Sequence, residues 1–248
     1  MKLAFFPGCS AKSSGFEYAN SALKLMKELG LKIVTPDFNC CGTHIVEEYN
    51  RDVWLALNAR NLAIAEEIEA DIVTICPACY QNLKKAKIIL ENEEEKKKIN
   101  GILASIDKEY TGKTSVFHVI ELLKKFTDKL KIKNKSKKVV AYYGCQILRP
   151  PELGIDNPEN PKIFENFLKE VGFKVEEFKA KSDCCGGTFL LTNPDGFKRR
   201  AESILNEAKK VADCIVTLCP LCQFSLEIVS SDIEVVPFTS LILNERKL

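Results

Sequence analysis

Short apolar runs alternate along this chain with longer segments in which apolar residues recur every three or four positions. Apolar runs of about four to eight residues are typical of buried strands, whereas a period of about 3.6 residues is typical of amphipathic helices. In the first half this pattern predicts a strand at 3–6, a helix at 16–29, a strand at 31–34, a helix at 58–68 and a strand at 71–75. Gly30 directly follows the first helical segment, where glycine commonly ends a helix.

The second half repeats this order of segments. Its pattern predicts a strand at 139–143, a helix at 163–171, a strand at 173–178, a helix at 199–211 and a strand at 214–218. Strands that alternate with helices form parallel sheets covered by helices. We therefore expect an α/β fold with two duplicated domains, each with a small, mostly parallel sheet flanked by helices. The expected domains are 1–130 and 139–248, with their boundary in the lysine-rich stretch Thr127–Lys138.

Composition narrows the class of protein. With 248 residues, of which 46% are hydrophobic and 28% charged, the chain resembles an ordinary globular protein. Its net charge of +2 does not indicate a nucleic-acid partner. No apolar run is long enough to cross a bilayer, so no transmembrane segment is expected. The apolar run before Pro7 is too short for a signal-peptide core, which favours a cytoplasmic protein with reduced thiols.

Ten of the eleven cysteines form one five-thiol pattern that occurs twice. Each copy has a single cysteine after its first strand, an adjacent pair followed by glycine, and a Cys-Pro-x-Cys motif after its last strand. The first set consists of Cys9, Cys40, Cys41, Cys76 and Cys79, and the second of Cys145, Cys184, Cys185, Cys219 and Cys222. Because α/β folds place their chemistry at the carboxyl ends of strands, we expect each set to converge on one site.

Clustered thiols in a reducing compartment indicate metal or redox chemistry. A structural zinc ion takes four ligands, so a fifth cysteine would be surplus in each copy. Adjacent cysteines point in different directions and suit a cluster of several irons, in which neighbouring thiolates reach different metals. The glycine after each pair lets the backbone approach a bulky sulfide. The ligand count therefore favours iron–sulfur clusters that use more than the ordinary four cysteines.

Two other interpretations stay open at this point. Each copy could bind a zinc ion with four cysteines and leave one unused. Each Cys-Pro-x-Cys motif could instead form a thioredoxin-like dithiol, because it follows a strand and begins a helix. That interpretation does not explain why three further cysteines recur in register both times. Cys214 lies outside the pattern and is expected to be a buried, inert thiol.

The repeated Cys…Cys-Cys-Gly…Cys-x-x-Cys pattern resembles the signature of the cysteine-rich CCG domain. A chain with two complete copies resembles the B subunit of heterodisulfide reductase. The resemblance covers nearly the whole chain, from Phe5–Cys9 through Ala59–Ala63 to Cys219–Cys222. The segments Gly144–Gln146 and Asp156–Pro158 also resemble the second half of that family.

The resemblance implies that each five-cysteine set holds one noncubane [4Fe-4S] cluster. It implies an oxidoreductase subunit that binds the disulfide of coenzyme M and coenzyme B, the heterodisulfide of methanogenesis, between its clusters and reduces it to two thiols. Electrons would arrive from a ferredoxin-like C subunit, fed by a flavin-bearing A subunit. Related CCG proteins belong instead to sulfur-oxidising complexes or to atypical succinate dehydrogenases and fumarate reductases. The chain could therefore also be an electron-transfer subunit of such a complex.

Few other residues are candidates for a site. Lys12 and Arg149 each follow a signature cysteine and could meet an anionic substrate, although solvated surface charge is the commoner role of such residues. His44 could tune a cluster by hydrogen bonding or be an ordinary loop histidine. His118 lies in an apolar stretch and is expected to face the core or its edge. No glycine-rich nucleotide fingerprint is present, so no flavin or nicotinamide is expected on this chain.

Overall fold

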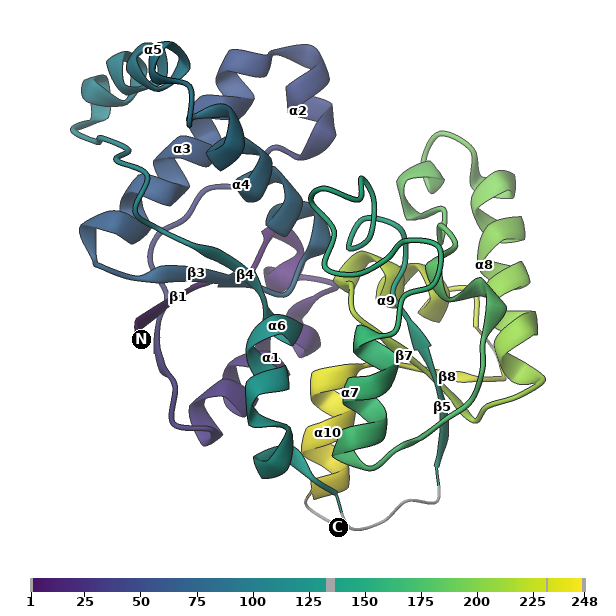
Figure 1. Cartoon of the computed structure of the whole chain (residues 1–248). Coiled ribbons are helices and arrows are strands. Elements are labelled where there is room, and N and C mark those ends of the chain that lie inside the picture. The colour runs from purple at the N-terminus through teal and green to yellow at the C-terminus, as the bar shows by residue number, and fades with distance from the viewer. Residues whose placement is uncertain (1, 133–136, 231, 247–248) are drawn as a thin grey trace. The chain divides into compact units, whose positions relative to one another are not determined.

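The computed structural model describes residues 2–132, 137–230 and 232–246 and contains two four-stranded parallel sheets (Figure 1). The first sheet has the order β2-β1-β3-β4, with strands β1 (Lys2–Phe6), β2 (Lys32–Val34), β3 (Asp71–Thr74) and β4 (Val116–His118). The second has the order β6-β5-β7-β8, with strands β5 (Lys138–Tyr142), β6 (Lys174–Val175), β7 (Cys214–Thr217) and β8 (Glu234–Pro237). The same strand order occurs twice, which confirms the predicted α/β fold with two duplicated parallel sheets.

Helices connect the parallel strands, as parallel pairing requires. The first half contains α1 (Phe16–Glu28), α2 (Thr43–Tyr49), α3 (Arg51–Glu67), α4 (Pro77–Ile89), α5 (Glu93–Leu103) and α6 (Val119–Leu123). The second half contains α7 (Ile163–Val171), α8 (Pro194–Lys209), α9 (Pro220–Glu227) and α10 (Phe238–Arg246). Short 3-10 turns lie at η1 (Cys9–Lys12), η2 (Ala104–Ile106), η3 (Lys124–Leu130), η4 (Lys179–Ser182) and η5 (Gly187–Phe189). Within the described ranges, no helix combines the length and apolar character that a membrane span requires.

The chain divides into two compact units. One comprises Met1–Cys9 and Met26–Val119, and the other comprises Ser10–Leu25 and Ile120–Leu248. The first part of α1 belongs to the second unit, where the Tyr18 hydroxyl donates a hydrogen bond to the Thr217 carbonyl oxygen at 3.2 Å. Ser21 and Thr239 share a second hydrogen bond of 2.6 Å there. Of the lysine-rich stretch in which the boundary is predicted, residues 133–136 lie outside the described residues.

Two helices begin earlier than the apolar pattern predicts. Helix α3 begins at Arg51, because the side chain of Asn50 caps it by accepting a hydrogen bond from a backbone N–H of the first turn. Asn193 caps α8 in the same way, with Pro194 as the first helical residue. The pattern also did not predict β4 or β8, whose runs of three and four residues are too short to show a periodicity.

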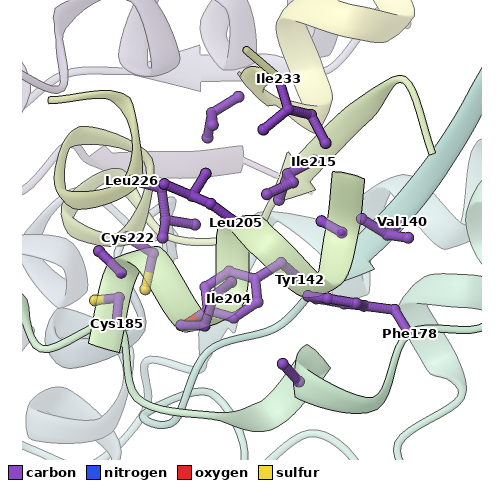
Figure 2. Packing of buried hydrophobic residues seen from close by; sticks show 14 of the residues in the cluster. Val140, Tyr142, Phe178, Cys185, Ile204, Leu205, Ile215, Cys222, Leu226 and Ile233 are labelled. Carbon is purple, nitrogen blue, oxygen red and sulfur yellow. The ribbon is translucent and has the colours of Figure 1, made fainter. Parts of the chain in front are cut away.

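The core of each unit lies between its sheet and the helices that pack on it. In the first unit, α3 and α4 contact β3, whose residues Ile72 and Thr74 are buried. In the second unit, α8 and α9 contact β7, and Tyr142, Ile204 and Leu226 pack together in the core (Figure 2). Close packing between each sheet and its helices fixes the positions of the strand ends. The loops that carry the signature cysteines begin at these ends.

Candidate metal centres

The single cysteine and the Cys-Pro-x-Cys motif of each copy follow neighbouring strands. In the first copy Cys9 follows β1 and Cys76 follows β3, which pair with each other. In the second copy Cys145 follows β5 and Cys219 follows β7, which pair in the same way. After the first strand of each pair, the next strand of the chain lies on one side of it (β2 or β6), and the strand after that lies on its other side (β3 or β7). The two strand ends therefore flank a topological switch point, where α/β folds bind their ligands.

Each Cys-Pro-x-Cys motif begins a helix. Cys76 caps α4 and Cys219 caps α9, and a proline occupies the first helical position in both. The Cys79 thiol and then the backbone N–H groups of Cys79 and Ala78 lower the pKa of the Cys76 thiol. The partial positive charge of a helix N-terminus favours a thiolate at this position. The start of the helix therefore favours a cysteine thiolate that can bind a metal cation.

A glycine in the left-handed region precedes the single cysteine of each copy. Gly8 has φ +77° and Gly144 has φ +69°. A Cβ atom added to Gly144 would lie 2.9 Å from Cys222 Sγ, whereas one added to Gly8 would lie 3.4 Å from Cys79 Sγ. The backbone thus approaches the last thiol of the set closely in both copies, and more closely in the second, which requires glycine there.

Asparagines of α3 hold the paired cysteines of the first copy. Asn58 Nδ2 donates to the Cys41 carbonyl oxygen at 3.0 Å. Asn61 Oδ1 accepts from the backbone N–H of Asn39, and its Nδ2 donates to the carbonyl oxygen of the same residue. Asn58 and Asn61 are fully buried, so these bonds fix the loop in front of Cys40 against the helix.

An aromatic side chain holds the paired cysteines of the second copy. Tyr142, the last residue of β5, donates from its hydroxyl to the Asp183 carbonyl oxygen at 2.6 Å, directly before Cys184. Figure 2 shows the sulfurs of Cys185 and Cys222 facing each other beside the Tyr142 ring, at one end of the core. The equivalent loops are therefore positioned by different side chains in the two copies.

The thiols of the first set form a connected group. Cys41 Sγ lies 3.5 Å from Cys79 Sγ, too far for a disulfide and close enough for a hydrogen bond. Hydrogen bonds from Cys40 and then Cys79 lower the pKa of Cys41 to about 3. A hydrogen bond from Cys79 likewise lowers the pKa of Cys76, and the donors Cys40 and Cys79 have raised pKa values. Cys9 lies close enough to act on Cys40 electrostatically.

The thiols of the second set are also linked by hydrogen bonds, but they are more buried than those of the first set. A hydrogen bond from Cys145 lowers the pKa of Cys184 to about 6, and one from Cys222 lowers the pKa of Cys185 to about 7. Their partners Cys145 and Cys222 have raised pKa values because they donate these bonds. Cys9 and Cys40 of the first set are exposed, whereas every thiol of the second set is at least half-buried. In each set two thiols thus have a lowered pKa, which favours the thiolate, the form that binds metal.

Backbone N–H groups surround these sulfurs. Gly42 N–H donates to Cys40 Sγ, and Gly186 N–H donates to Cys184 Sγ, both at 3.4 Å. Gly187 N–H donates to Cys185 Sγ at the same distance. Hydrogen bonds to cysteine sulfur are one of the ways in which proteins set the reduction potential of iron–sulfur clusters. Free thiols with N–H donors directed at them are suited to bind an iron–sulfur cluster. Across the described ranges, no three His, Cys, Asp or Glu side chains are arranged as a site for a single metal ion.

The remaining sequence candidates are exposed or lie in the core. Lys12 and His44 are exposed. Arg149 is exposed and forms an ion pair with Glu159 at 3.1 Å, in agreement with a solvated charge. His118 is fully buried in β4, which confirms that it faces the core. Cys214 is also fully buried, as predicted, at the first position of β7.

The cysteine pattern did not point to the polar side chains that support the cysteines. Asn82 donates to Cys41 Sγ at 3.7 Å, and Ser225 lies beside Cys185. Both follow the last cysteine of their motif by three residues, which places them one helical turn further on the same face. This shared offset was visible in the sequence. The contacts of Asn58 and Asn61 were not, because they depend on how α3 packs.

Comparisons with known proteins agree with this geometry. A family model described as a cysteine-rich (CCG) domain matches residues 3–84 and 139–227. Over 238 residues the chain is 34% identical to the 8-methylmenaquinol:fumarate reductase membrane anchor subunit of Wolinella succinogenes, a match that covers 93% of this chain and 84% of the relative. Over 243 residues it is 31% identical to the B subunit of the ferredoxin/F(420)H(2)-dependent CoB-CoM heterodisulfide reductase of Methanosarcina acetivorans, a match that covers 91% and 79%. The chain belongs to the family of heterodisulfide reductase B subunits.

Two further matches bear on that family. A protein of Archaeoglobus profundus, named as being like the heterodisulfide reductase B subunit, is 32% identical over 244 residues, with 92% of this chain and 81% of the relative covered. Among solved structures, a hypothetical protein from Helicobacter pylori has a TM-score of 0.82 at 14% identity, which shows a shared fold. The match covers all of this chain but only 49% of that one. As an iron–sulfur protein of this B-subunit family with two CCG domains, the chain is an oxidoreductase subunit.

Proposed function

We propose that this chain is the iron–sulfur catalytic subunit of a heterodisulfide reductase-like complex and holds two noncubane [4Fe-4S] clusters. The main support is that two sets of five free thiols lie at equivalent places of a duplicated fold, each set carried by three loops. Bound clusters would supply one electron each, so that a disulfide of the coenzyme M–coenzyme B type takes up two electrons and two protons and leaves as two thiols.

All ten signature cysteines would bind the clusters. The first set, Cys9, Cys40, Cys41, Cys76 and Cys79, would hold one cluster, and the second, Cys145, Cys184, Cys185, Cys219 and Cys222, would hold the other. In the second copy Cys184 lies beside Cys145 and Cys185 lies beside Cys222, so the two thiols of the pair would bind the cluster together with different partners. The left-handed glycines before Cys9 and Cys145 would leave room beside the last thiol of each set.

The partners follow from the same proposal. A ferredoxin-like C subunit would deliver electrons to this chain, and a flavin-bearing A subunit would feed that C subunit. This division suits a chain whose sequence has no nucleotide-binding fingerprint. Free cysteines and iron–sulfur clusters also suit a reducing cytoplasmic location.

A second candidate function is electron transfer without disulfide chemistry. The relative from Wolinella succinogenes, at 34% identity over 93% of this chain, is named a subunit of a fumarate reductase. A chain of this kind would hold its clusters with the same cysteines and pass electrons to or from another subunit. The substrate would then be bound elsewhere in the complex.

Disulfide reduction by the purified chain separates the two functions. We expect the anaerobically purified protein, supplied with a reduced viologen dye, to convert the coenzyme M–coenzyme B disulfide to thiols at a rate proportional to its iron content. Fumarate and cystine serve as control acceptors. Dye oxidation that is unchanged by the heterodisulfide, in a protein with its full iron content, would favour the electron-transfer function.

A further inference from the structure

An amide side chain outside the cysteine pattern is aimed at the first candidate centre. Asn82 Nδ2 donates to Cys41 Sγ at 3.7 Å and to the Ala78 carbonyl oxygen at 2.7 Å. Asn82 is 8% exposed and Cys41 is 1% exposed, so little water competes for this contact. A hydrogen bond in such a place is electrostatically stronger than one at the surface.

A tryptophan fixes which way this amide points. Trp54 Nε1 donates to Asn82 Oδ1 at 2.7 Å, and the Trp54 side chain is fully buried in α3. An indole N–H can only donate, so the amide oxygen must face Trp54 and the amide nitrogen must face Cys41. The N–H donor at the sulfur is therefore held in place by a residue outside the cysteine pattern.

The second copy has a different residue at the equivalent position. Ser225 follows Cys222 by three residues, as Asn82 follows Cys79. Its buried hydroxyl lies beside Cys185 but, among the described residues, has no hydrogen-bond partner of ordinary geometry. In the first copy an amide of fixed orientation thus donates to the sulfur, whereas in the second a hydroxyl that can rotate lies beside it.

The difference affects how easily each centre accepts an electron. A cluster bound by thiolates becomes more negative on reduction, and a hydrogen bond to a ligand sulfur stabilises that added charge and raises the reduction potential. Water at the exposed thiols of Cys9 and Cys40 solvates the added charge and acts in the same direction. In the first copy both the Asn82 amide and the exposed thiols act in this direction, whereas in the second copy the Gly187 N–H donates to Cys185 Sγ at 3.4 Å.

We propose that Asn82, oriented by Trp54, is a positioning residue that raises the reduction potential of the first centre. This inference rests on the proposed function, because it requires an iron–sulfur cluster bound by Cys41.

A redox titration followed by electron paramagnetic resonance tests this inference on the full chain. In Trp54→Phe/Asn82→Leu, both partners of the amide–indole bond become apolar, so no buried indole N–H is left without a partner. At a fixed applied potential, we expect the ratio of reduced to oxidised first centre to fall about tenfold, equivalent to about 59 mV for a one-electron couple. The second centre should keep its potential.

Two single variants complete the design. Asn82→Ser introduces the residue of the second copy and should lower the potential of the first centre by a smaller amount, even if the double variant does not fold. Ser225→Ala, the matched control, should leave the first centre unchanged. Unchanged potentials in all Asn82 variants with full iron content would overturn the inference alone. A wild-type chain without iron and sulfide would overturn the proposed function and this inference with it.

Discussion

Replacement of Cys41 by alanine is expected to remove half of the iron and acid-labile sulfide, leaving about four atoms of each per chain instead of about eight. Cys41 is the most connected thiol of the first set: it contacts Cys79 Sγ at 3.5 Å and accepts a hydrogen bond from Asn82. It is also the thiol whose pKa is lowered to about 3, mainly by the hydrogen bond from Cys40, so it binds metal without losing a proton at neutral pH.

The matched control for this variant is Cys214→Ala. Cys214 is as deeply buried as Cys41 but lies outside the repeated pattern, so its replacement should leave about eight irons per chain. Cys185→Ala should halve the iron content as Cys41→Ala does, and the double variant should bind almost none. Equal iron in Cys41→Ala and Cys214→Ala would show that the pair in the first copy does not bind a cluster.

Replacement of Gly144 by alanine is expected to prevent cluster binding at the second centre. In the cluster-free chain it should lower the free energy of unfolding only by the backbone strain at this position. Its φ of +69° strains any residue with a Cβ, at a cost of about 1–2 kcal/mol. The new Cβ would also lie 2.9 Å from Cys222 Sγ. A free thiol can rotate away from this contact, whereas a thiol that binds iron cannot. Iron analysis of the variant should therefore give about half the wild-type content.

Variants of two other glycines distinguish the effect of backbone strain from the effect of the new Cβ contact. Gly30 has φ +79°, but an added Cβ would meet nothing within 4 Å, so Gly30→Ala should lose only the strain energy and keep all its iron. Gly8→Ala places its Cβ 3.4 Å from Cys79 Sγ, an ordinary contact, and should keep most of the first centre. Urea unfolding of the three cluster-free variants should give similar losses of stability. A Gly144→Ala chain with full iron content would contradict the predicted contact.

Most of the fold could be predicted because its signals are local and occur twice. The apolar runs that became β1 and β3, and the turn residues after them, are visible in the sequence without knowledge of tertiary contacts. The repeat then identified the cysteines as two equivalent sets. By contrast, β4 and β8 are short strands that exist because they pair with β3 and β7, which no sequence period reveals.

The supports of the candidate centres depend on packing and were therefore missed. Asn58 and Asn61 look like ordinary polar residues of a helix until α3 is placed against the loop of the paired cysteines. His44 shows the opposite case, because its position next to a signature glycine indicated a role although its side chain is exposed on α2. Proximity in sequence is thus a weak guide to contact, whereas an equal offset in both copies, as for Asn82 and Ser225, is a stronger one.

The metal and sulfide content of the anaerobically purified chain tests the central claim most directly. Two clusters held by ten cysteines predict about eight irons and about eight acid-labile sulfides per chain, without stoichiometric zinc. About two zinc ions per chain and no sulfide would contradict this account and support a tetrahedral four-cysteine site in each copy.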